Sequence, residues 1–481
     1  MKQSDIKDVV IIGGGVSGLA TAYRLQTTPH DVLLLEKNRR LGGSILTEEI
    51  DGFLVDCGPN STLDTAPAIR DFVREVGLQE LRINANPSAS RRYILRDGKL
   101  QTLPMSPPKF LSSKLFSWQA KLRLLAEPFI SAAPEDKEET IAEFVKRRLG
   151  QEFLDYAVNP FIAGVYAGDP EKLSVRSAVA KIYALEKNYG SLIKGAIKGA
   201  KERKKRGDTD KTKAQLFSFH NGMSELVNRL VEELGACVKT GCTIEKILPS
   251  AESNPFYTIQ FATPDGKKQV KTKSVVFTTP AFVTAKFLKP LNDSVSKRLE
   301  EITYPPVAMV FLGYKRQPEC RTLDGYGFLV PEVENRKILG CIWSSTLFPN
   351  RAPGEGIALT TFVGGMRQPQ LLEQDDQQLS ETVLGELGAI LNLKGRPDVI
   401  RIKRWEKAIP QYEIGHQSRI ATLDDFEANH PGIFISGNYR EGISVGDCIV
   451  NSEKVTQKVM THLQNPKTRK ISQDKKLTTT I

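Results

Sequence analysis

The sequence predicts an α/β protein whose N-terminal part is a Rossmann-type dinucleotide-binding domain, and three observations support this fold class. Residues 9–12 are a short apolar run that is typical of a buried parallel strand. Gly13, Gly15 and Gly18 follow directly as G-x-G-x-x-G, and apolar residues then continue with helical spacing. A second apolar run at residues 32–35 ends on Glu36, which lies 23 residues after Gly13.

This order of strand, glycine turn, helix, strand and acid predicts a dinucleotide site. Gly15 lets a pyrophosphate approach the backbone, and the helix N-terminus attracts the phosphates. The carboxylate of Glu36 suits a free ribose 2′-hydroxyl and would repel a 2′-phosphate, which favours FAD or NAD over NADP. The run R-x-G-G at residues 40–43 resembles amine-oxidase-like flavoproteins and is not needed for NAD, so we expect FAD. A purely structural βαβ unit is the alternative, because glycine-rich turns are common.

Composition restricts the partners. The chain has 481 residues, enough for two or three domains, and a net charge of +11. This charge suits nucleic acid, an anionic membrane or an acidic ligand, but no basic repeat carries interleaved aromatics, so we expect no nucleic acid. The six cysteines are scattered, and Cys237 and Cys242 lack a second pair, so we expect reduced thiols and no metal. The first strand starts near Asp8 and no run of 18 apolar residues occurs, so we expect a cytoplasmic chain without a leader or transmembrane helix.

Turn residues and helical spacing organise the middle of the chain. Residues 61–77 and residues 140–149, capped by Thr140, are expected as helices, and prolines make residues 103–109 a linker. The lysine-rich residues 201–213 are expected as a solvated loop, with an anionic-lipid contact as the alternative. Apolar segments between residues 304 and 364 predict an antiparallel sheet. One expected helical stretch carries large apolar residues in a basic setting. This pattern indicates either a membrane-facing surface or an ordinary helical core with a basic rim. The apolar residues are Phe110, Leu111, Phe116 and Trp118, and the lysines are Lys109, Lys114 and Lys121.

Longer motifs are more specific than the glycine turn. They are FIAGVYAGDP at 161–170, YPPVA at 304–308, SSTLFPNRAP at 344–353, FVGG at 362–365, and GNY with GISVG at 437–446. Through these motifs the chain resembles the oxygen-dependent protoporphyrinogen oxidases over nearly its whole length, and their plant plastid branch most closely. The sequence shows no transit peptide, so we expect a bacterial enzyme.

The resemblance implies a p-hydroxybenzoate-hydroxylase-like FAD-binding domain, an antiparallel-sheet substrate domain and a helical membrane-docking insertion. The FAD-binding domain would comprise residues 1–78, 215–283 and 415–466, the substrate domain 79–98 and 284–414, and the insertion 99–214. Residues 467–481 would form a disordered basic tail. The implied partners are a porphyrinogen and O2. An anionic membrane, such as the inner face of the plasma membrane, and a homodimer are left open.

Matched residue by residue, the resemblance assigns FAD binding to the glycine turn, the acid after the second strand and later segments. These positions are Gly13, Gly14, Gly15, Val16, Ser17, Gly18, Glu36, Lys37, Gly43, Gly58, Pro59, Asn60, Val238, Trp405, Ile443, Ser444 and Val445. The last three begin a helix, whose N–H groups would stabilise negative charge at flavin N1–C2=O.

The resemblance also assigns substrate contacts. Arg92 matches an arginine that pairs with a tetrapyrrole propionate, and a plain surface charge is the alternative. The other positions match a pocket around the macrocycle, with the indole of Trp343 stacking on a pyrrole ring: Gly164, Val307, Leu323 and Trp343. Asn60 stands where some relatives carry arginine, so the second propionate lacks an obvious partner, and Arg91 and Lys99 are candidates.

The implied reaction removes six electrons from protoporphyrinogen IX in three rounds at one flavin, and each round reduces O2 to H2O2. No catalytic acid or base is assigned; His220 and His416 are the candidates by elimination. Three alternatives stay open: a coproporphyrinogen III oxidase, another amine-oxidase-like flavoenzyme such as a carotenoid desaturase, and a flavin-binding protein without catalysis.

Overall fold

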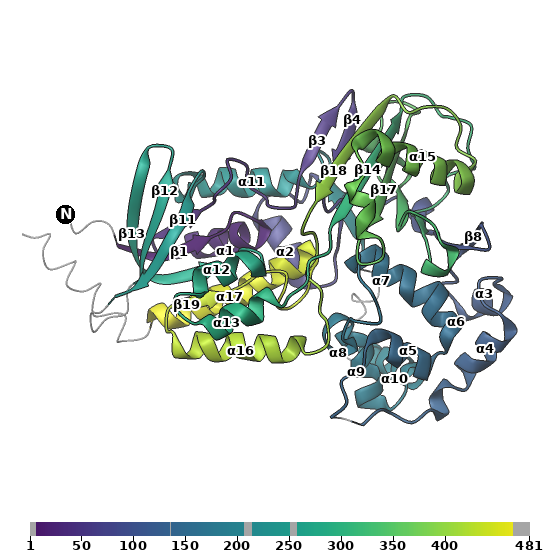
Figure 1. The fold of residues 1–481 in the computed structure, drawn as a ribbon, viewed down its shortest axis with the longest axis horizontal. Coiled ribbons are helices and arrows are strands. Elements are labelled where there is room, and N and C mark those ends of the chain that lie inside the picture. Colours follow the sequence, from purple (N-terminus) through teal and green to yellow (C-terminus); the bar gives the residue numbers. More distant parts are fainter. Residues whose placement is uncertain (1–5, 135, 206–213, 251–256, 465–481) are drawn as a thin grey trace, which may run out of the picture.

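The first sheet is built around the two strands of the predicted dinucleotide-binding unit. The computed structural model describes residues 6–134, 136–205, 214–250 and 257–464 (Figure 1). The parallel strands of this sheet are β10 (Val238–Lys239), β2 (Val32–Leu35), β1 (Ile6–Ile12), β13 (Gly266–Phe277) and β19 (Ile433–Ile435). An antiparallel extension follows beside β13, made of β12 (Tyr257–Thr263) and β11 (Thr243–Pro249).

Helices cover both faces of this sheet, which explains why the buried ends of its central strands, residues 9–12 of β1 and 275–277 of β13, are apolar. Val9 and Ile11 of β1 pack in one apolar layer, and Val10 and Ile12 pack in the other. The first layer includes α1 (Val16–Gln26), α2 (Pro67–Glu75), α11 (Ser224–Leu234) and α17 (Val445–Gln464). The second includes α12 (Ala281–Leu288), α13 (Asp293–Glu300) and α16 (His416–Asn429).

The helices α1 and α17 lie side by side and run in the same direction. Near their starts, the thiol of Cys448 interacts with the hydroxyl of Ser17. Further along both helices, Arg24 Nε donates a hydrogen bond to Ser452 Oγ at 3.3 Å. The N-termini of both helices therefore point toward the same end of the domain.

The second sheet has the strand order β18-β14-β17-β16-β15-β7-β8. Its members are β18 (Val399–Trp405), β14 (Val307–Tyr314), β17 (Ile357–Gly364), β16 (Gly340–Trp343), β15 (Gly327–Leu329), β7 (Arg92–Arg96) and β8 (Lys99–Thr102). We call the side covered by α15 (Asp376–Leu391) the back face and the other side the front face. Val310 and Leu312 pack with α15 on the back, whereas Val307 and Met309 belong to apolar clusters on the front. The predicted antiparallel sheet is thus present, with one parallel pair between β15 and β7.

Smaller paired strands connect the two sheets. A hairpin of β3 (Thr47–Ile50) and β4 (Phe53–Asp56) lies near β14 in Figure 1, and Phe53 packs edge-on against Phe311. Three further strands form a separate small sheet in the order β5 (Thr62–Leu63), β9 (Leu216–Phe219) and β6 (Arg82–Asn84). Residues 61–77 are therefore not one helix: a strand precedes α2, which starts at Pro67, where proline is favoured.

A helical region separates the two parts of the second sheet in sequence and lies at the lower right of Figure 1. It comprises α3 (Pro107–Ser112), α4 (Trp118–Leu125), α5 (Ile141–Arg148), α6 (Gln151–Phe153), α7 (Asn159–Tyr166), α8 (Val175–Ala178), α9 (Ala180–Tyr189) and α10 (Leu192–Lys205). The predicted cap at Thr140 is confirmed, because its hydroxyl accepts from Glu143 N at 3.1 Å within a full capping box. Among the described residues, no helix has the length and apolar composition needed to cross a membrane.

One expectation about this insertion is corrected, and one choice that the sequence left open is decided for two residues. Residues 201–205 are not a loop but the end of α10, and the rest of the lysine-rich stretch lies outside the described residues, as does the predicted tail. Phe116 is buried and stacks on Phe153 with ring centroids 4.4 Å apart, and Lys121 is buried while its Nζ donates to the carbonyls of Leu111 and Ser113. Those two side chains belong to the helical core.

Candidate functional site

Of the glycines in the turn between β1 and α1, Gly15 alone has free space where a side chain would be. A Cβ on Gly18 would lie 2.0 Å from the carbonyl oxygen of Gly13, so α1 can pack this closely against β1 only without a side chain there. A Cβ on Gly15 would meet nothing within 4 Å. No side chain caps α1 at Gly15. The N-terminus of α1 therefore faces open space, which fits a phosphate group.

The other residues predicted around the adenosine end lie beside this turn. Gly14 N donates to Glu36 Oε2 at 2.7 Å, so the acid sits at the glycine turn, as a ribose-binding carboxylate must. A Cβ on Gly43 would lie 3.2 Å from Gly15 Cα, so these two glycines are close neighbours. Val238 pairs with Leu34 of β2, and Lys37 is exposed after the end of that strand. The predicted FAD positions around Glu36 thus form one continuous edge.

The turn at residues 57–60 joins this domain to the second sheet. Trp405 Nε1 donates to the carbonyl of Cys57 at 3.0 Å, and Trp405 pairs with Val307 across β18 and β14. A Cβ on Gly58 would lie 1.9 Å from the carbonyl oxygen of Ser44, so the chain passes too closely for a side chain. Pro59 and Asn60 follow, and Asn60 Oδ1 accepts a hydrogen bond from Ser61.

A buried ion pair that the sequence analysis missed fixes the start of this turn. Arg351 donates to Asp56 Oδ2 at 3.2 Å, and both side chains are almost fully buried. Arg351 also donates to Ser218 Oγ at 2.7 Å, while Asp56 accepts from Thr47 and from Met223 N. The signal was available, because Arg351 is the single charged residue in the motif at 344–353.

The start of α17 forms the next part of the site. Ser444 and Asp447 cap it reciprocally: Ser444 Oγ accepts from Asp447 N at 3.0 Å, and Ser444 N donates to Asp447 Oδ2 at 3.2 Å. The N–H of Ser444 is therefore already engaged by the helix's own cap, which the sequence analysis did not anticipate. Ile443 packs against the apolar cluster of the helical insertion, and Val445 is buried in the first domain.

The helix α7 turns one apolar face toward solvent. We call Phe161, Gly164 and Val165 the α7 face; all three are exposed, whereas Ile162 and Tyr166 are buried. A Cβ on Gly164 would lie 2.5 Å from Leu329 of β15, so the α7 face begins where the helix meets the front of the second sheet. Val307 packs with Ala163 in the same small cluster. The structure thus brings together the predicted positions Gly164 and Val307.

Arg92 lies on the front face, whereas its neighbour Arg91 is already paired with an acidic residue. Alternation along β7 puts Tyr93 and Leu95 in the back cluster and Ile94 against the insertion, so Arg92 shares the front face with Ile94. Arg91 forms an ion pair with Asp324, which also accepts from Tyr93 Oη. Arg92 has no acidic partner among the described residues.

The surroundings of Arg92 connect it to the turn at residues 57–60. Its guanidinium lies over the ring of Tyr326, 5.5 Å from the centroid. The phenol of Tyr326 interacts with the hydroxyl of Ser61, next to Asn60. Lys99, the other candidate for a carboxylate, is exposed in the hairpin that follows β7.

Two predicted substrate positions lie away from this assembly. Trp343 is 0% exposed and packs with Tyr93 on the back face, 5.5 Å between ring centroids. Leu323 is partly buried against the same back-face cluster. The predicted stacking of Trp343 on a substrate ring is not compatible with this placement, because the sheet itself lies between the indole and the α7 face.

The two histidines named by elimination differ in environment. His416 is buried and stacks on Tyr412 with centroids 4.2 Å apart, and burial lowers the pKa of His416 to about 4. It is therefore neutral at physiological pH. His220 is exposed, and its backbone carbonyl accepts from Asn350 Nδ2. Neither lies on the α7 face.

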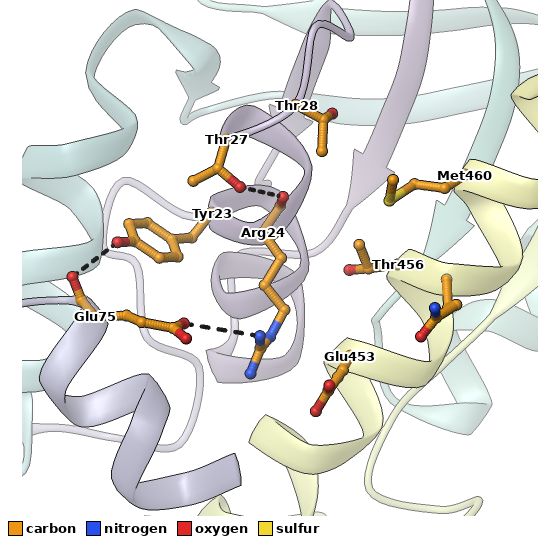
Figure 2. Close-up of a pocket in the computed structure, with 9 residues that line it drawn as sticks. Tyr23, Arg24, Thr27, Thr28, Glu75, Glu453, Thr456 and Met460 are labelled. Carbon is orange, nitrogen blue, oxygen red and sulfur yellow. Dashed lines mark hydrogen bonds and ion pairs between the residues drawn. The ribbon is translucent and has the colours of Figure 1, made fainter.

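A surface hollow of about 400 Å³ lies between α1, α2 and α17, and Figure 2 shows its lining. Thr28 lies just beyond the C-terminus of α1 and Met460 lies in the C-terminal part of α17, so the hollow lies away from the N-termini that face the glycine turn. Arg24 and Glu75 approach to 3.9 Å across it, and Tyr23 Oη donates to the carbonyl of Glu75. This hollow is not part of the site.

Replacing Gly15 tests the phosphate position. We expect Gly15→Ala to leave the melting temperature unchanged, because the new Cβ meets open space and Gly15 has φ −75°, which alanine adopts. The same methyl would obstruct a pyrophosphate, so we expect the Kd for FAD to rise at least about tenfold, or about 1.4 kcal/mol. Titration of the apoprotein with FAD, followed by flavin fluorescence, measures this. Gly385→Ala, which also meets nothing within 4 Å, is the matched control, and an unchanged Kd for Gly15→Ala would contradict the assignment.

Comparison with known proteins gives relatives along nearly the whole chain. Protoporphyrinogen oxidase 1, chloroplastic, of Spinacia oleracea is 36% identical over 95% of this chain and 85% of its own length. The Arabidopsis thaliana protein of the same name is 35% identical over 92% of this chain and 86% of its own. Coproporphyrinogen III oxidase of Bacillus subtilis (strain 168) is 28% identical over 95% and 98%.

Solved structures share the fold. A crystal structure from Exiguobacterium sp. 255-15, described as a candidate protoporphyrinogen oxidase, superposes with a TM-score of 0.79 at 25% identity, over 97% of this chain and all of the other. Reduced UDP-galactopyranose mutase superposes with a TM-score of 0.71 at 17% identity, over 96% and 98%, which shows a common fold.

The model of one family, flavin containing amine oxidoreductase, matches residues 16–460. This match begins at the first residue of α1 and includes the second sheet, the helical insertion and the start of α17. The open space before α1 and the carboxylate at Glu36 fit FAD, which is the cofactor. The chain belongs to the flavin containing amine oxidoreductase family.

Proposed function

We propose that this chain oxidises protoporphyrinogen IX to protoporphyrin IX. In the balanced reaction, one protoporphyrinogen IX and three O2 give one protoporphyrin IX and three H2O2. The observation that carries the proposal is the position of Arg92 on the front face, close to both the α7 face and the turn at residues 57–60. Its guanidinium has no acidic partner in the part of the chain that the structure describes. The names of the relatives in plants support the same substrate.

The chemistry of the substrate matches these surfaces. Protoporphyrinogen IX is a large apolar macrocycle that carries two carboxylates on neighbouring rings. The α7 face would bury the apolar edge, and Arg92 would hold a carboxylate through its paired N–H groups. Gly164 lets α7 pack closely against Leu329, which brings the α7 face next to the front of the second sheet.

The residues of the chain bind and orient rather than transfer protons. When bound, FAD supplies the acceptance of two electrons in each round and their return to O2. His416 stays neutral inside the protein and does not reach the α7 face. The chain therefore contributes through position, by holding the macrocycle in one orientation against the turn at residues 57–60.

The proposal extends to an anionic membrane surface, with the chain docked from the cytoplasm on the inner face of the plasma membrane. Trp118, Leu122 and Leu125 are spaced i, i+4, i+7 on α4 and are all more than 60% exposed, and Phe129 beyond them is 88% exposed. Lys109 and Lys114 are exposed near this stripe. An apolar stripe with nearby lysines and a chain charge of +11 favours anionic lipid.

The test of the reaction is an anaerobic titration. We expect the visible flavin absorption of the holoenzyme to bleach when protoporphyrinogen IX is added, and to recover in air as porphyrin fluorescence rises. Coproporphyrinogen III is the matched alternative substrate, because it offers the same ring with four carboxylates. Faster bleaching by coproporphyrinogen III would replace the proposed substrate, and no bleaching by either would favour a different amine-oxidase-like enzyme or a non-catalytic flavoprotein.

Removing the guanidinium of Arg92 tests substrate binding. We expect Arg92→Ala to raise the KM for protoporphyrinogen IX about tenfold. A hydrogen bond to a charged group typically contributes about 1.5–3 kcal/mol, and the expected change is near the lower end of that range. Flavin content should stay unchanged. Arg91→Ala is the control: it removes an adjacent arginine that already pairs with Asp324, and its KM should equal that of the unsubstituted chain. An unaltered KM for Arg92→Ala would remove Arg92 from the proposal.

Vesicle sedimentation tests the membrane surface. We expect the double variant Trp118→Ser, Leu122→Ser to lose at least about tenfold in affinity for vesicles of phosphatidylglycerol, because two exposed apolar side chains no longer insert. Ile400→Ser, which replaces an exposed apolar residue on β18, should bind as the unsubstituted chain does. Equal binding of the double variant would contradict the α4 surface, and equal binding to neutral vesicles would contradict the electrostatic part.

A further inference from the structure

Tyr412 lies where the helical insertion meets the first domain. The segment that carries it runs from β18 to α16, and the side chain of Tyr412 is only 2% exposed. Neither the glycine turn nor the motifs of the sequence analysis include this residue. Its contacts on two sides give it a role that its position in the sequence does not suggest.

On one side Tyr412 is attached to the insertion. Its backbone carbonyl accepts a hydrogen bond from Ser174 N at 2.8 Å, and the following residue, Glu413, pairs with Leu173. The ring of Tyr412 packs edge-on against Tyr166, 6.0 Å between centroids. Tyr166 is on α7 and is a buried residue of the same helix that presents the α7 face.

On the other side the phenol of Tyr412 holds the segment that leads into α17. Tyr412 Oη donates to the carbonyl of Asn438 and accepts a hydrogen bond from Gly442 N at 2.9 Å. Gly442 has φ +117°, and Ile443 follows it directly. One oxygen atom thus closes the loop of residues 438–442 immediately before the N-terminus of α17.

The ring itself has little freedom to move. His416, the first residue of α16, stacks on it at 4.2 Å between ring centroids with an interplanar angle of 14°. Burial raises the pKa of Tyr412 well above its ordinary value, so the phenol keeps its proton and can both donate and accept at physiological pH. Three packed groups, from α7, α16 and the 438–442 loop, therefore meet at one side chain.

We propose that Tyr412 is a positioning residue that couples the helical insertion to the start of α17, and so holds the backbone N–H groups of Ile443 and Val445 in place beside the flavin. This inference deepens the proposed function and rests on it for the location of the flavin. A shift of α7, which presents the α7 face, would be transmitted through Tyr166 and Tyr412 to Gly442. The insertion and the flavin end of α17 would then respond to each other without direct contact between substrate and Tyr412.

The test uses Tyr412→Phe in the FAD-loaded full chain, because phenylalanine keeps the ring contacts and removes only the phenol oxygen. Tyr257→Phe is the matched control, since Tyr257 Oη also donates to a backbone carbonyl in the first domain, that of Pro431 at 3.0 Å. We expect the two-electron midpoint potential of bound FAD to fall in Tyr412→Phe and to stay constant in Tyr257→Phe. If the protein prefers reduced over oxidised FAD tenfold less strongly, the two-electron midpoint potential falls by about 30 mV.

Amide hydrogen exchange gives a second readout that needs neither substrate nor FAD. In the apoprotein we expect the peptide that contains residues 438–445 to exchange about threefold to tenfold faster in Tyr412→Phe, because two hydrogen bonds that close this loop are lost. The same peptide should be unaffected in Tyr257→Phe. This measurement also covers the case in which the variant retains too little flavin for a potential to be read.

The outcomes separate this inference from the proposed function. An unchanged potential together with unchanged exchange in Tyr412→Phe would overturn the inference, even if protoporphyrinogen IX is oxidised normally. Faster exchange with an unchanged potential would also overturn it, because the phenol would then stabilise the loop without affecting the flavin. Failure of the unsubstituted chain to oxidise any porphyrinogen would overturn the proposed function, while the potential shift could still be measured.

Discussion

The contact between the carbonyl of Gly13 and the first turn of α1 is the constraint on which the site depends. A side chain at Gly18 would lie 2.0 Å from that oxygen, so the helix can take its position only because residue 18 is glycine. The position of α1 then determines where its N-terminus points. Because α17 runs beside α1 in the same direction, the N-terminus of α17 is set at the same end of the domain.

The two sheets are joined by specific polar contacts at this end, in addition to apolar packing. Trp405 binds the carbonyl of Cys57, and Arg351 forms a buried ion pair with Asp56, so residues of the second sheet and its loops hold the start of one turn through two contacts. A buried ion pair costs much of its Coulombic gain in desolvation, and its removal from one side leaves an unpaired charge. Such a pair contributes mainly by allowing one relative placement of the parts that it links, which is what a turn beside a cofactor requires.

The first domain could be predicted from the sequence because its signals are local. The glycine spacing and Glu36 directly after β2 each depend on residues close together in the chain, and so does the capping box at Thr140 in the insertion. Leu323 and Trp343 were placed around the substrate by resemblance alone, and the face of a strand depends on register, which the matched motif does not report. Trp343 is therefore buried under α15 instead.

Other features could not be predicted because they join distant segments. Tyr412 meets Tyr166, Ser174 and Gly442, and only the folded chain brings these together. The helix at residues 201–205 was missed for a different reason: its dense lysines and arginines indicated a solvated loop, but α10 continues through them to Lys205. Charge density alone does not distinguish a loop from a solvated helix end.

The alternation of side chains along β7 also bears on which porphyrinogen the proposed enzyme prefers. Adjacent arginines point to opposite faces of the sheet, so Asp324 neutralises Arg91, whereas Arg92 on the front pairs with no acidic side chain among the described residues. A ring whose two carboxylates lie on neighbouring pyrroles can turn that edge to Arg92 and its apolar edge to Phe161 and Val165. Coproporphyrinogen III carries a carboxylate on every pyrrole, so any orientation that reaches Arg92 places other carboxylates against the α7 face. Desolvating an unpaired carboxylate costs several kcal/mol, roughly, even after relaxation. The geometry of one exposed guanidinium beside an apolar helix face therefore favours the substrate with fewer charges.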